Sequence, residues 1–316
     1  MSASFSTDWQ SVDRARWDAL HAQACAAHQQ DWAYGEAMES AGSRVLRACL
    51  KRPNGEAIGL AQVIVRPVAM IGSLALCTHG PAWIGASDAS ERAAAMRSLK
   101  ASLPLRWPRL LAISPDSGEA PKGFRRVMTG DATVRIDLTV APDALRAGLN
   151  GKWRNRLVAA ERSDIAFTTN GAKPGQYQWL LDAENAQRKS RGYKSLPTAL
   201  MAQWQEAKAS ARSGDKRGGV VVYRADAGAG RDREPVAAML FLLHGSMATY
   251  HIGWTSDQGR RNHAHTLILW NAMLDLKARG IRALDLGGVN TASGAGIARF
   301  KLGAGGTVLQ RAGAFV

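Results

Sequence analysis

The segment from Ala248 to Gly306 constrains the fold more than any other part of this 316-residue chain. It begins with a run rich in β-branched and aromatic residues, which predicts a strand over 247–254. A helix with a broad apolar face is predicted over 265–276, and Gly280 is placed to end it. The residues 281–286 then predict a second strand. The expected order is therefore strand, basic loop, helix, strand and glycine-rich loop.

The basic loop before the predicted helix carries four candidate ligand-binding residues. These are Arg260, Arg261, Asn262 and His265. Free backbone N–H groups and cationic side chains at a helix N-terminus attract anions, above all phosphate. We therefore expect this loop to contact a phosphate group of a donor molecule.

The same segment resembles a known family. Its strand, basic turn, helix and strand are similar to the donor-binding core of the GNAT acyltransferases, although 258–264 matches their pyrophosphate loop only loosely. The Asp-Leu-Gly-Gly sequence at 285–288 and the Phe-Lys pair followed by glycines at 300–306 resemble the Fem-type (FemAB-like) branch. Shorter similarities occur at 59–63, 80–83 and 145–155, so the resemblance spans most of the chain.

The resemblance implies a mixed α/β fold of two tandem GNAT-like domains with a cleft between them. The length suits two domains of ordinary size. We expect an N-terminal domain over 1–140 and a basic, donor-binding domain over 141–316, with 287–301 bordering the cleft.

The Fem-type resemblance also implies roles for two residues. Lys301 would supply positive charge to the oxyanion of the tetrahedral intermediate, and Phe300 would touch the terminal nucleotide of the donor. Without the resemblance, Lys301 would be an ordinary edge charge at a strand start. Asp285 could act as a base or orient the nucleophile, but an acid before Gly-Gly more often binds nearby backbone N–H groups.

Further candidates fall into two groups. Glycines that permit close backbone approach to the donor are Gly287, Gly288 and Gly303. Candidate cleft residues are Tyr250, His251, Trp254, Lys152 and Arg154. Tyr250 and His251 are adjacent on one strand and should face opposite sides, so only one can point into a cleft. The family's Asp-Pro in the first domain is replaced here by Ser114-Pro115-Asp116.

The positive charge lies mainly in the second half. Residues 1–140 carry 16 Lys and Arg against 13 Asp and Glu, whereas 141–316 carry 25 against 13. One predicted helix alone bears Lys152, Arg154, Arg156 and Arg162. A one-sided basic surface suits a polyanion such as tRNA or another RNA, an anionic lipid surface or a phosphate-bearing precursor, although a solvated basic surface would give the same count.

The remaining features exclude several classes. The three cysteines follow no metal-ligand or redox spacing, and no permanent cofactor or metal is expected. No signal peptide or transmembrane segment is predicted, because the longest apolar run has about eight residues and a membrane span needs roughly 20. We expect a cytoplasmic protein that contacts the inner face of the membrane at most peripherally.

Three functions fit the sequence. The first is a Fem-like N-acyltransferase that moves an aminoacyl group from aminoacyl-tRNA to an amine of a cell-wall precursor, peptide or small molecule. The second is a GNAT enzyme that uses acyl-CoA or acyl carrier protein. The third is a non-catalytic protein with a GNAT fold that binds RNA or a membrane surface.

Overall fold

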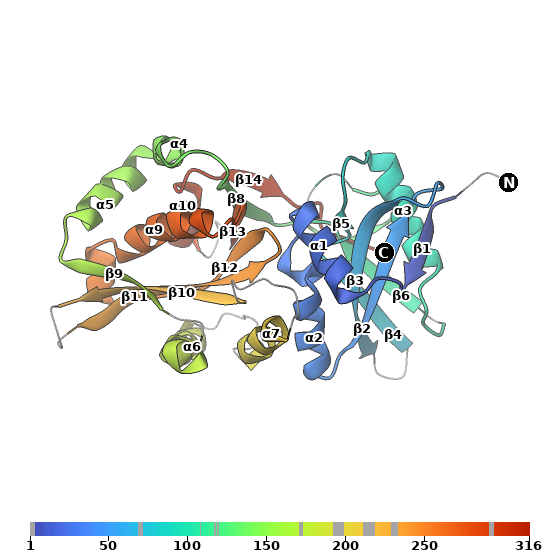
Figure 1. Ribbon diagram of the computed structural model, residues 1–316, viewed down its shortest axis with the longest axis horizontal. Helices are drawn as coiled ribbons and strands as arrows, with labels where there is room; N and C mark the ends of the chain where they lie inside the picture. Colours follow the sequence, from blue (N-terminus) through green and yellow to red (C-terminus); the bar gives the residue numbers. More distant parts are fainter. Residues whose placement is uncertain are drawn as a thin grey trace. The chain divides into compact units, whose positions relative to one another are not determined.

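The computed structural model describes residues 4–68, 72–107, 109–116, 118, 120–170, 173–191, 199–210, 219–228, 233–290 and 294–316. The chain divides into two compact units (Figure 1). The first unit comprises Met1–Ala132, Glu206–Gly214 and Leu309–Val316, and the second comprises Thr133–Gln205 and Asp215–Val308. The expected mixed α/β fold is confirmed, because each unit is built on one sheet with helices packed against it.

The sheet of the first unit is antiparallel except for one pair. Its order is β1 (Ser6–Trp9), β2 (Arg44–Lys51), β3 (Ala57–Val68), β4 (Gly72–Thr78), β6 (Arg109–Ser114), β15 (Ala314–Phe315) and β7 (Arg126–Met128), with β5 (Ala82–Trp83) paired to β3. The Pro-Asn-Gly turn at 53–55 joins β2 to β3, and Gly55 takes the positive φ of 85° that a glycine tolerates. Strands β4 and β6 are the parallel pair.

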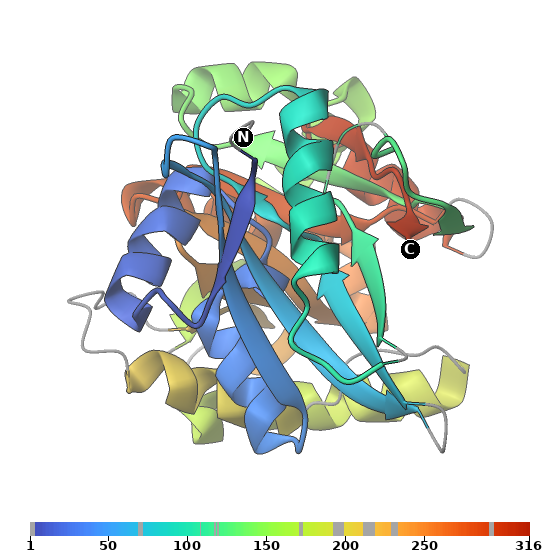
Figure 2. The same ribbon diagram turned by 90° about the vertical axis from the view of Figure 1, so that its right-hand side faces the viewer.

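Helices cover both faces of this first sheet. Leu46, Ala48 and Leu50 of β2 pack with α3 (Ala89–Ala101), which Figure 2 shows across the near face. Cys49 of the same strand points to the other face and shares a cluster with Trp17 of α1 (Arg14–Ala24). The short helix η1 (His28–Gln30) and α2 (Trp32–Ser40) follow α1 in the chain. Burial on both faces explains why β2 is a nearly continuous apolar run.

The sheet of the second unit also contains one parallel pair. Its order is β14 (Thr307–Gln310), β8 (Ala132–Asp137), β13 (Ala283–Gly288), β12 (Met247–Thr255), β11 (Glu234–His244), β10 (Val220–Ala227) and β9 (Ile165–Asn170). Strands β10, β11 and β12 form an antiparallel meander. Strands β12 and β13 are parallel, because the helical segment between them returns the chain to the same edge.

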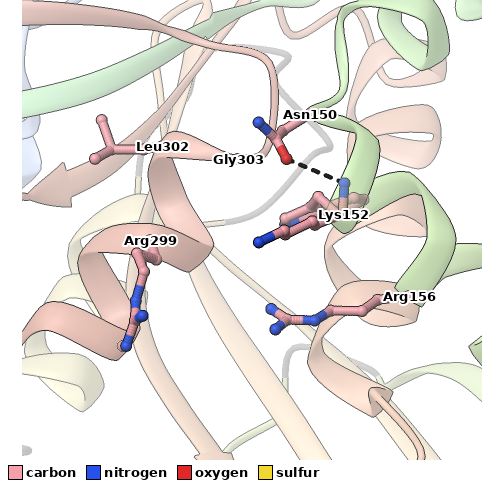
Figure 3. Close-up of a pocket in the computed structure, with 8 residues that line it drawn as sticks. Asn150, Lys152, Arg156, Arg299, Leu302 and Gly303 are labelled. Carbon is pink, nitrogen blue, oxygen red and sulfur yellow. Dashed lines mark hydrogen bonds between the residues drawn. The ribbon is translucent and has the colours of Figure 1, made fainter.

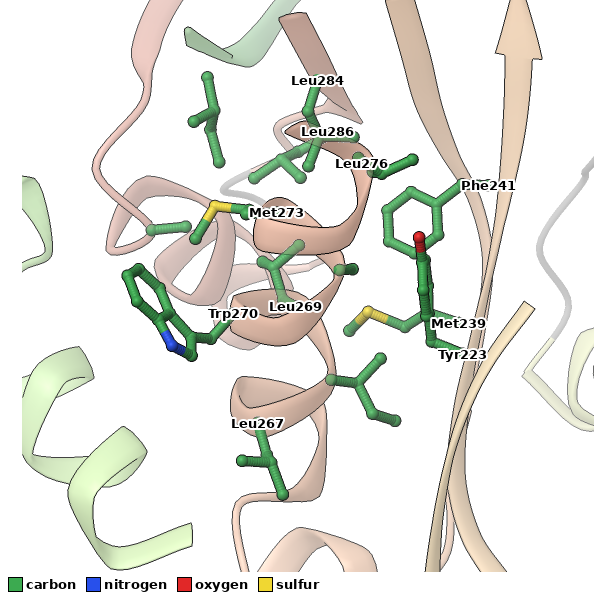
Figure 4. Close-up of a cluster of buried hydrophobic side chains, with 14 of the residues drawn as sticks. Tyr223, Met239, Phe241, Leu267, Leu269, Trp270, Met273, Leu276, Leu284 and Leu286 are labelled. Carbon is green, nitrogen blue, oxygen red and sulfur yellow. The ribbon is translucent and has the colours of Figure 1, made fainter. Parts of the chain in front are cut away.

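The helices of the second unit lie on both sides of its sheet. They are α4 (Pro142–Gly148), α5 (Gly151–Glu161), α6 (Pro174–Arg191), α7 (Ala199–Ala209, whose last turn belongs to the first unit), α8 (Asp257–Arg261), α9 (Ala264–Ala278) and α10 (Ala295–Leu302). Helices α5 and α9 lie on one side and α6 on the other (Figure 1). Leu269, Met273 and Leu276 of α9 meet Met239 and Phe241 of β11 in the main core (Figure 4).

Three local predictions are wrong. The residues 143–161 predict one continuous helix, but this helix is broken, since Leu149 is extended (φ −64°, ψ 138°) and the Asn150 side chain caps α5 by accepting from the Lys152 N–H. The basic loop is largely the short helix α8. Phe300 and Lys301 lie in helix α10 and not at the start of a strand, because the backbone carbonyls of Gly294 and Arg299 accept the N–H groups of Ala298 and Gly303.

The two sheets share an unusual order at one edge. In the first sheet, β15 lies between β6 and β7. In the second sheet, β8 lies between β13 and β14. Strand β8 directly follows β7 in the chain, and β15 directly follows β14. The chain therefore passes from the first sheet to the second between β7 and β8, and returns to the first sheet between β14 and β15.

Candidate functional site

The parallel strands β12 and β13 part from one another midway along their length. Their pairing runs from Met247 opposite Ala283 to Thr249 opposite Asp285. Beyond this point β12 continues beside β11 as far as Thr255, whereas β13 continues beside β8. The register is irregular on both strands near the parting. On β13 the shift lies between Asp285 and Gly288, and on β12 it lies between Tyr250 and Ile252, opposite Phe241 and Leu240 of β11. The parting exposes backbone groups of both strands.

Lys301 of α10 lies at this parting. Its Nζ donates to the carbonyl of Gly288 at 2.8 Å and stands 5.8 Å from the centre of the Tyr250 ring. A Cβ added at Gly287, whose φ is 73°, would lie 3.6 Å from the Lys301 Nζ. The glycine is therefore needed for the left-handed backbone, whereas the ammonium group would make only ordinary van der Waals contact with an added Cβ.

The Lys301 side chain is buried and electrostatically perturbed. The residue is only 8% exposed. Burial lowers the pKa of Lys301 below its ordinary value, and the nearby Asp285 carboxylate opposes that shift. A buried cation with one carbonyl acceptor is costly for stability, which is typical of a functional group.

Asp285 is held by three donors. Its carboxylate accepts from the Thr133 hydroxyl, from the Gly287 N–H at 2.7 Å and from Arg135 at 3.3 Å. The contact with the Gly287 amide is the kind that the sequence favours for an acid before Gly-Gly. These bonds stabilise the carboxylate and fix the turn at Gly287, so the geometry favours a positioning role.

Phe300 and His265 pack together under α10. The half-buried Phe300 ring lies 6.0 Å from the Trp153 ring and 6.2 Å from that of His265, and its carbonyl accepts from the Trp153 indole at 3.1 Å. His265 bonds the Trp254 carbonyl at 2.9 Å, and burial lowers its pKa to about 4. Trp254 itself meets the edge of Trp179 at 5.6 Å. His265 and Trp254 therefore contribute to packing at the positions that the structure gives them.

His251 lies in the irregular part of β12. Leu240 pairs with Ile252 and Phe241 with Tyr250, so His251 is the extra residue of a β-bulge and the simple alternation with Tyr250 is interrupted. Burial lowers the pKa of His251 to about 4, so its imidazole is neutral at neutral pH. Tyr250 packs against the main core and against Phe241 at 5.6 Å.

The cationic segment before α9 is partly self-neutralised. Arg260 pairs with Asp257 at 2.6 Å and donates to the Thr255 carbonyl at 3.0 Å. The N–H groups of Asn262 and His263 donate to carbonyls of α8, so they are not the free amides that the sequence suggests. Arg261 is exposed. Phosphate binding by Arg260, Arg261 and Asn262 stays a prediction.

A pocket of about 510 Å³ lies between α5 and α10 (Figure 3). Its lining residues are Asn150, Lys152, Trp153, Arg156, Gly296, Arg299, Leu302 and Gly303. Lys152 and Arg156 extend from α5 toward α10, which carries Arg299 (Figure 3). The predicted cleft residue Arg154 turns away and donates to the carbonyls of Ala147 and Leu149. Sequence reasoning missed Arg299, because its spacing from Leu302 and Gly303 has meaning only once 295–302 is known to be helical.

Other kinds of site find little support in the described ranges. These contain no group of three His, Cys, Asp or Glu residues placed to hold a metal ion. Nor does any helix in the described part of the chain have the length and apolarity to cross a membrane.

Comparison with known proteins defines the class. Residues 148–302, which include α5, the meander, β13 and α10, match the family described as the acetyltransferase (GNAT) domain. Residues 148–302 therefore form a GNAT domain, and the protein is an acyltransferase. A search of curated proteins finds no match.

The whole chain has the Fem-type fold. The crystal structure of FemX is similar with a TM-score of 0.79 and 13% sequence identity, covering 98% of this chain and 96% of FemX. A conserved protein of unknown function from Bacteroides thetaiotaomicron has a TM-score of 0.57 and 12% identity over 98% of this chain and 99% of that one. The C-terminal domain of a putative lysylphosphatidylglycerol synthetase from Agrobacterium fabrum has a TM-score of 0.53 and 12% identity, covering 96% and 92%.

Proposed function

We propose that this protein transfers an aminoacyl group from aminoacyl-tRNA to an amine of a cell-wall precursor, a peptide or a small molecule. The observation that carries the proposal is the buried Lys301 ammonium group at the parting of β12 and β13. In this reaction the amine nitrogen bonds to the ester carbonyl carbon and the ester C–O bond breaks. The proton lost by the amine balances the hydroxyl released on the tRNA.

Lys301 stabilises the charge that develops during this step. Negative charge appears on the carbonyl oxygen in the transition state, and a fixed cation in a water-poor site stabilises it strongly. An ammonium group has three N–H donors, and the Gly288 carbonyl accepts from one of them at 2.8 Å. That bond also fixes the position of the group before the donor binds, which reduces the reorganisation required.

Asp285 acts through the backbone in this proposal. Its bonds to Thr133 and to the Gly287 N–H hold the end of β13 in place. The carbonyl of the following residue, Gly288, accepts the hydrogen bond from Lys301. The carboxylate also favours the charged form of Lys301. We assign Asp285 to positioning and charge balance. The base that takes the proton of the attacking amine would lie elsewhere, beside the bound acceptor.

The excess of 12 positive charges over 141–316 supports a tRNA donor, since cations around a site bind a polyanion through counterion release. The match of 148–302 to an acetyltransferase domain favours a second donor, acyl-CoA or an acylated carrier protein. We further propose that the protein acts in the cytoplasm, with peripheral contact to an anionic membrane.

Parallel assays of the donors test the proposal. Purified protein is incubated with a pool of charged tRNA, with acetyl-CoA and with longer acyl-CoA, each with a mixture of amines, and products are identified by mass spectrometry. We expect amides carrying amino acids from the tRNA pool, and none from Lys301→Met. Transfer only from CoA would replace the proposed donor, and no transfer from any donor would contradict the proposed function.

A further inference from the structure

The pocket between α5 and α10 is lined by three cationic side chains. Lys152 and Arg156 stand four residues apart on α5, one turn of the helix, and so share one face. Arg299 lies on α10, which carries the opposite wall (Figure 3). Within the described ranges, none of the three has a carboxylate at ion-pair distance. Other arginines of this unit are each paired with a carboxylate, namely Arg146, Arg224, Arg260 and Arg279.

The rest of the pocket suits a nucleotide. The first turn of the 11-residue helix α5 borders it, so the helix dipole adds positive potential beside Lys152. Leu302, which is 41% exposed, gives it an apolar surface next to the charges, over the buried Trp153. A volume of about 510 Å³ lies within the usual range for ligand pockets. Cations beside an apolar surface match a phosphate attached to a sugar and base.

We propose that this pocket binds a phosphate group of the nucleotide that carries the acyl group. This inference rests on the proposed function in one respect, namely that the bound nucleotide is the acyl donor. Arg299 and Lys301 are two residues apart on α10, about 3 Å along the helix axis. Arg299 borders the pocket while Lys301 reaches β13, so one helix carries both the phosphate contact and the catalytic ammonium group.

Neighbouring cations are less suited to this role. Arg154 of the same helix is bound to the carbonyls of Ala147 and Leu149. Arg260 is paired with Asp257. Lys152, Arg156 and Arg299 are exposed side chains that line one volume, so a phosphate there can gain several charge-assisted hydrogen bonds. The Arg299 Nε also donates to the Ala295 carbonyl at 3.3 Å, within its own helix.

Equilibrium binding of two phosphate-bearing probes tests the pocket without requiring turnover. The probes are a fluorescent RNA hairpin with a single-stranded 3′-CCA end and a fluorescent coenzyme A, titrated with full-length protein at several salt concentrations. The test variants are Lys152→Glu with Arg156→Glu, and Arg299→Glu. The control is Arg162→Glu, an exposed residue at the far end of α5 that gives the same charge change as Arg299→Glu and half that of the double variant.

We expect the RNA to bind at least tenfold more weakly to the double variant and to Arg299→Glu, and within about twofold of wild type to Arg162→Glu. The slope of log affinity against log salt should fall by roughly 0.7 for each lost phosphate contact. Weakening of coenzyme A alone would support the phosphate pocket and contradict a tRNA donor. Equal losses in the control and test variants, no loss in any variant, or no binding of either probe to wild type would overturn the pocket, whatever the transfer assay shows.

Discussion

Replacement of Lys301 by methionine separates a catalytic lysine from a structural one. Two terms of opposite sign act on the stability of the fold. The variant loses the 2.8 Å hydrogen bond from Nζ to Gly288, and a bond of this charged type contributes about 1.5–3 kcal/mol. It also removes an ammonium group that is 92% shielded from solvent, since the residue is 8% exposed, and burial of such an ion costs several kcal/mol.

Methionine is unbranched and fills the volume of the lysine stem, so no large cavity is expected. Because the two terms have opposite signs, the free energy of unfolding should fall by no more than about 1 kcal/mol, and it should rise if removal of the buried charge dominates. The transfer rate should fall at least about 100-fold, which corresponds to roughly 2.7 kcal/mol of transition-state stabilisation.

Thermal unfolding and single-turnover transfer at saturating donor measure the two quantities on the same protein. Donor affinity, from the same titration, should stay within a few-fold of wild type. A variant that unfolds several degrees lower but transfers at the normal rate would refute the reasoning, because Lys301 would then be a structural residue.

Further predictions concern the surroundings of Lys301. Burial lowers the pKa of Lys301 below its ordinary value of 10.5. If the reaction needs the protonated form, the transfer rate should therefore fall, as pH rises, at a pH below 10.5. Lys301→Arg should remove this alkaline limb from the pH–rate profile. Phe300→Ala should weaken donor binding by roughly 1–3 kcal/mol if its ring stacks on a terminal base, whereas unchanged affinity with lower stability would restrict the ring to packing. Arg260→Glu with Arg261→Glu should weaken RNA binding less than the changes in the α5–α10 pocket, since Asp257 already pairs with Arg260; an equal or greater loss in the same titration would place the phosphate at α8. Gly253→Ala should destabilise the fold by about 1–3 kcal/mol in chemical denaturation, because the added Cβ would lie 1.8 Å from the Tyr250 hydroxyl; wild-type stability would show that Tyr250 moves freely.

The fold of the C-terminal segment could be predicted because its signals are local. The strand over 247–254, the helix beginning near 264 and the strand ending at Gly288 follow from composition and from a glycine or turn residue at each end. The Fem-type fold followed from two short motifs near the C-terminus, which the similarity to FemX confirms for the fold.

The site could be predicted only in part, because most of its geometry depends on tertiary contacts. The irregular pairing that makes His251 an extra residue arises between β11 and β12, and the residues of β12 alone do not reveal it. The break at Leu149 was hidden by good helix formers on both sides, and it places Lys152 at a helix N-terminus facing the pocket. The partners of Asp285 include Thr133 and Arg135, about 150 positions away in sequence, so no local pattern indicates them.

The two chain crossings, at β7–β8 and at β14–β15, bear on how this protein can be divided. A fragment ending at residue 140 lacks β15, which leaves β6 and β7 without the strand between them. A fragment starting at 141 lacks β8 and exposes the edge of β13, the strand that carries Asp285 and the glycine pair. Unpaired edges of this kind promote aggregation. We therefore expect that neither fragment folds alone, and that mixing the two expressed fragments restores soluble protein that neither yields alone.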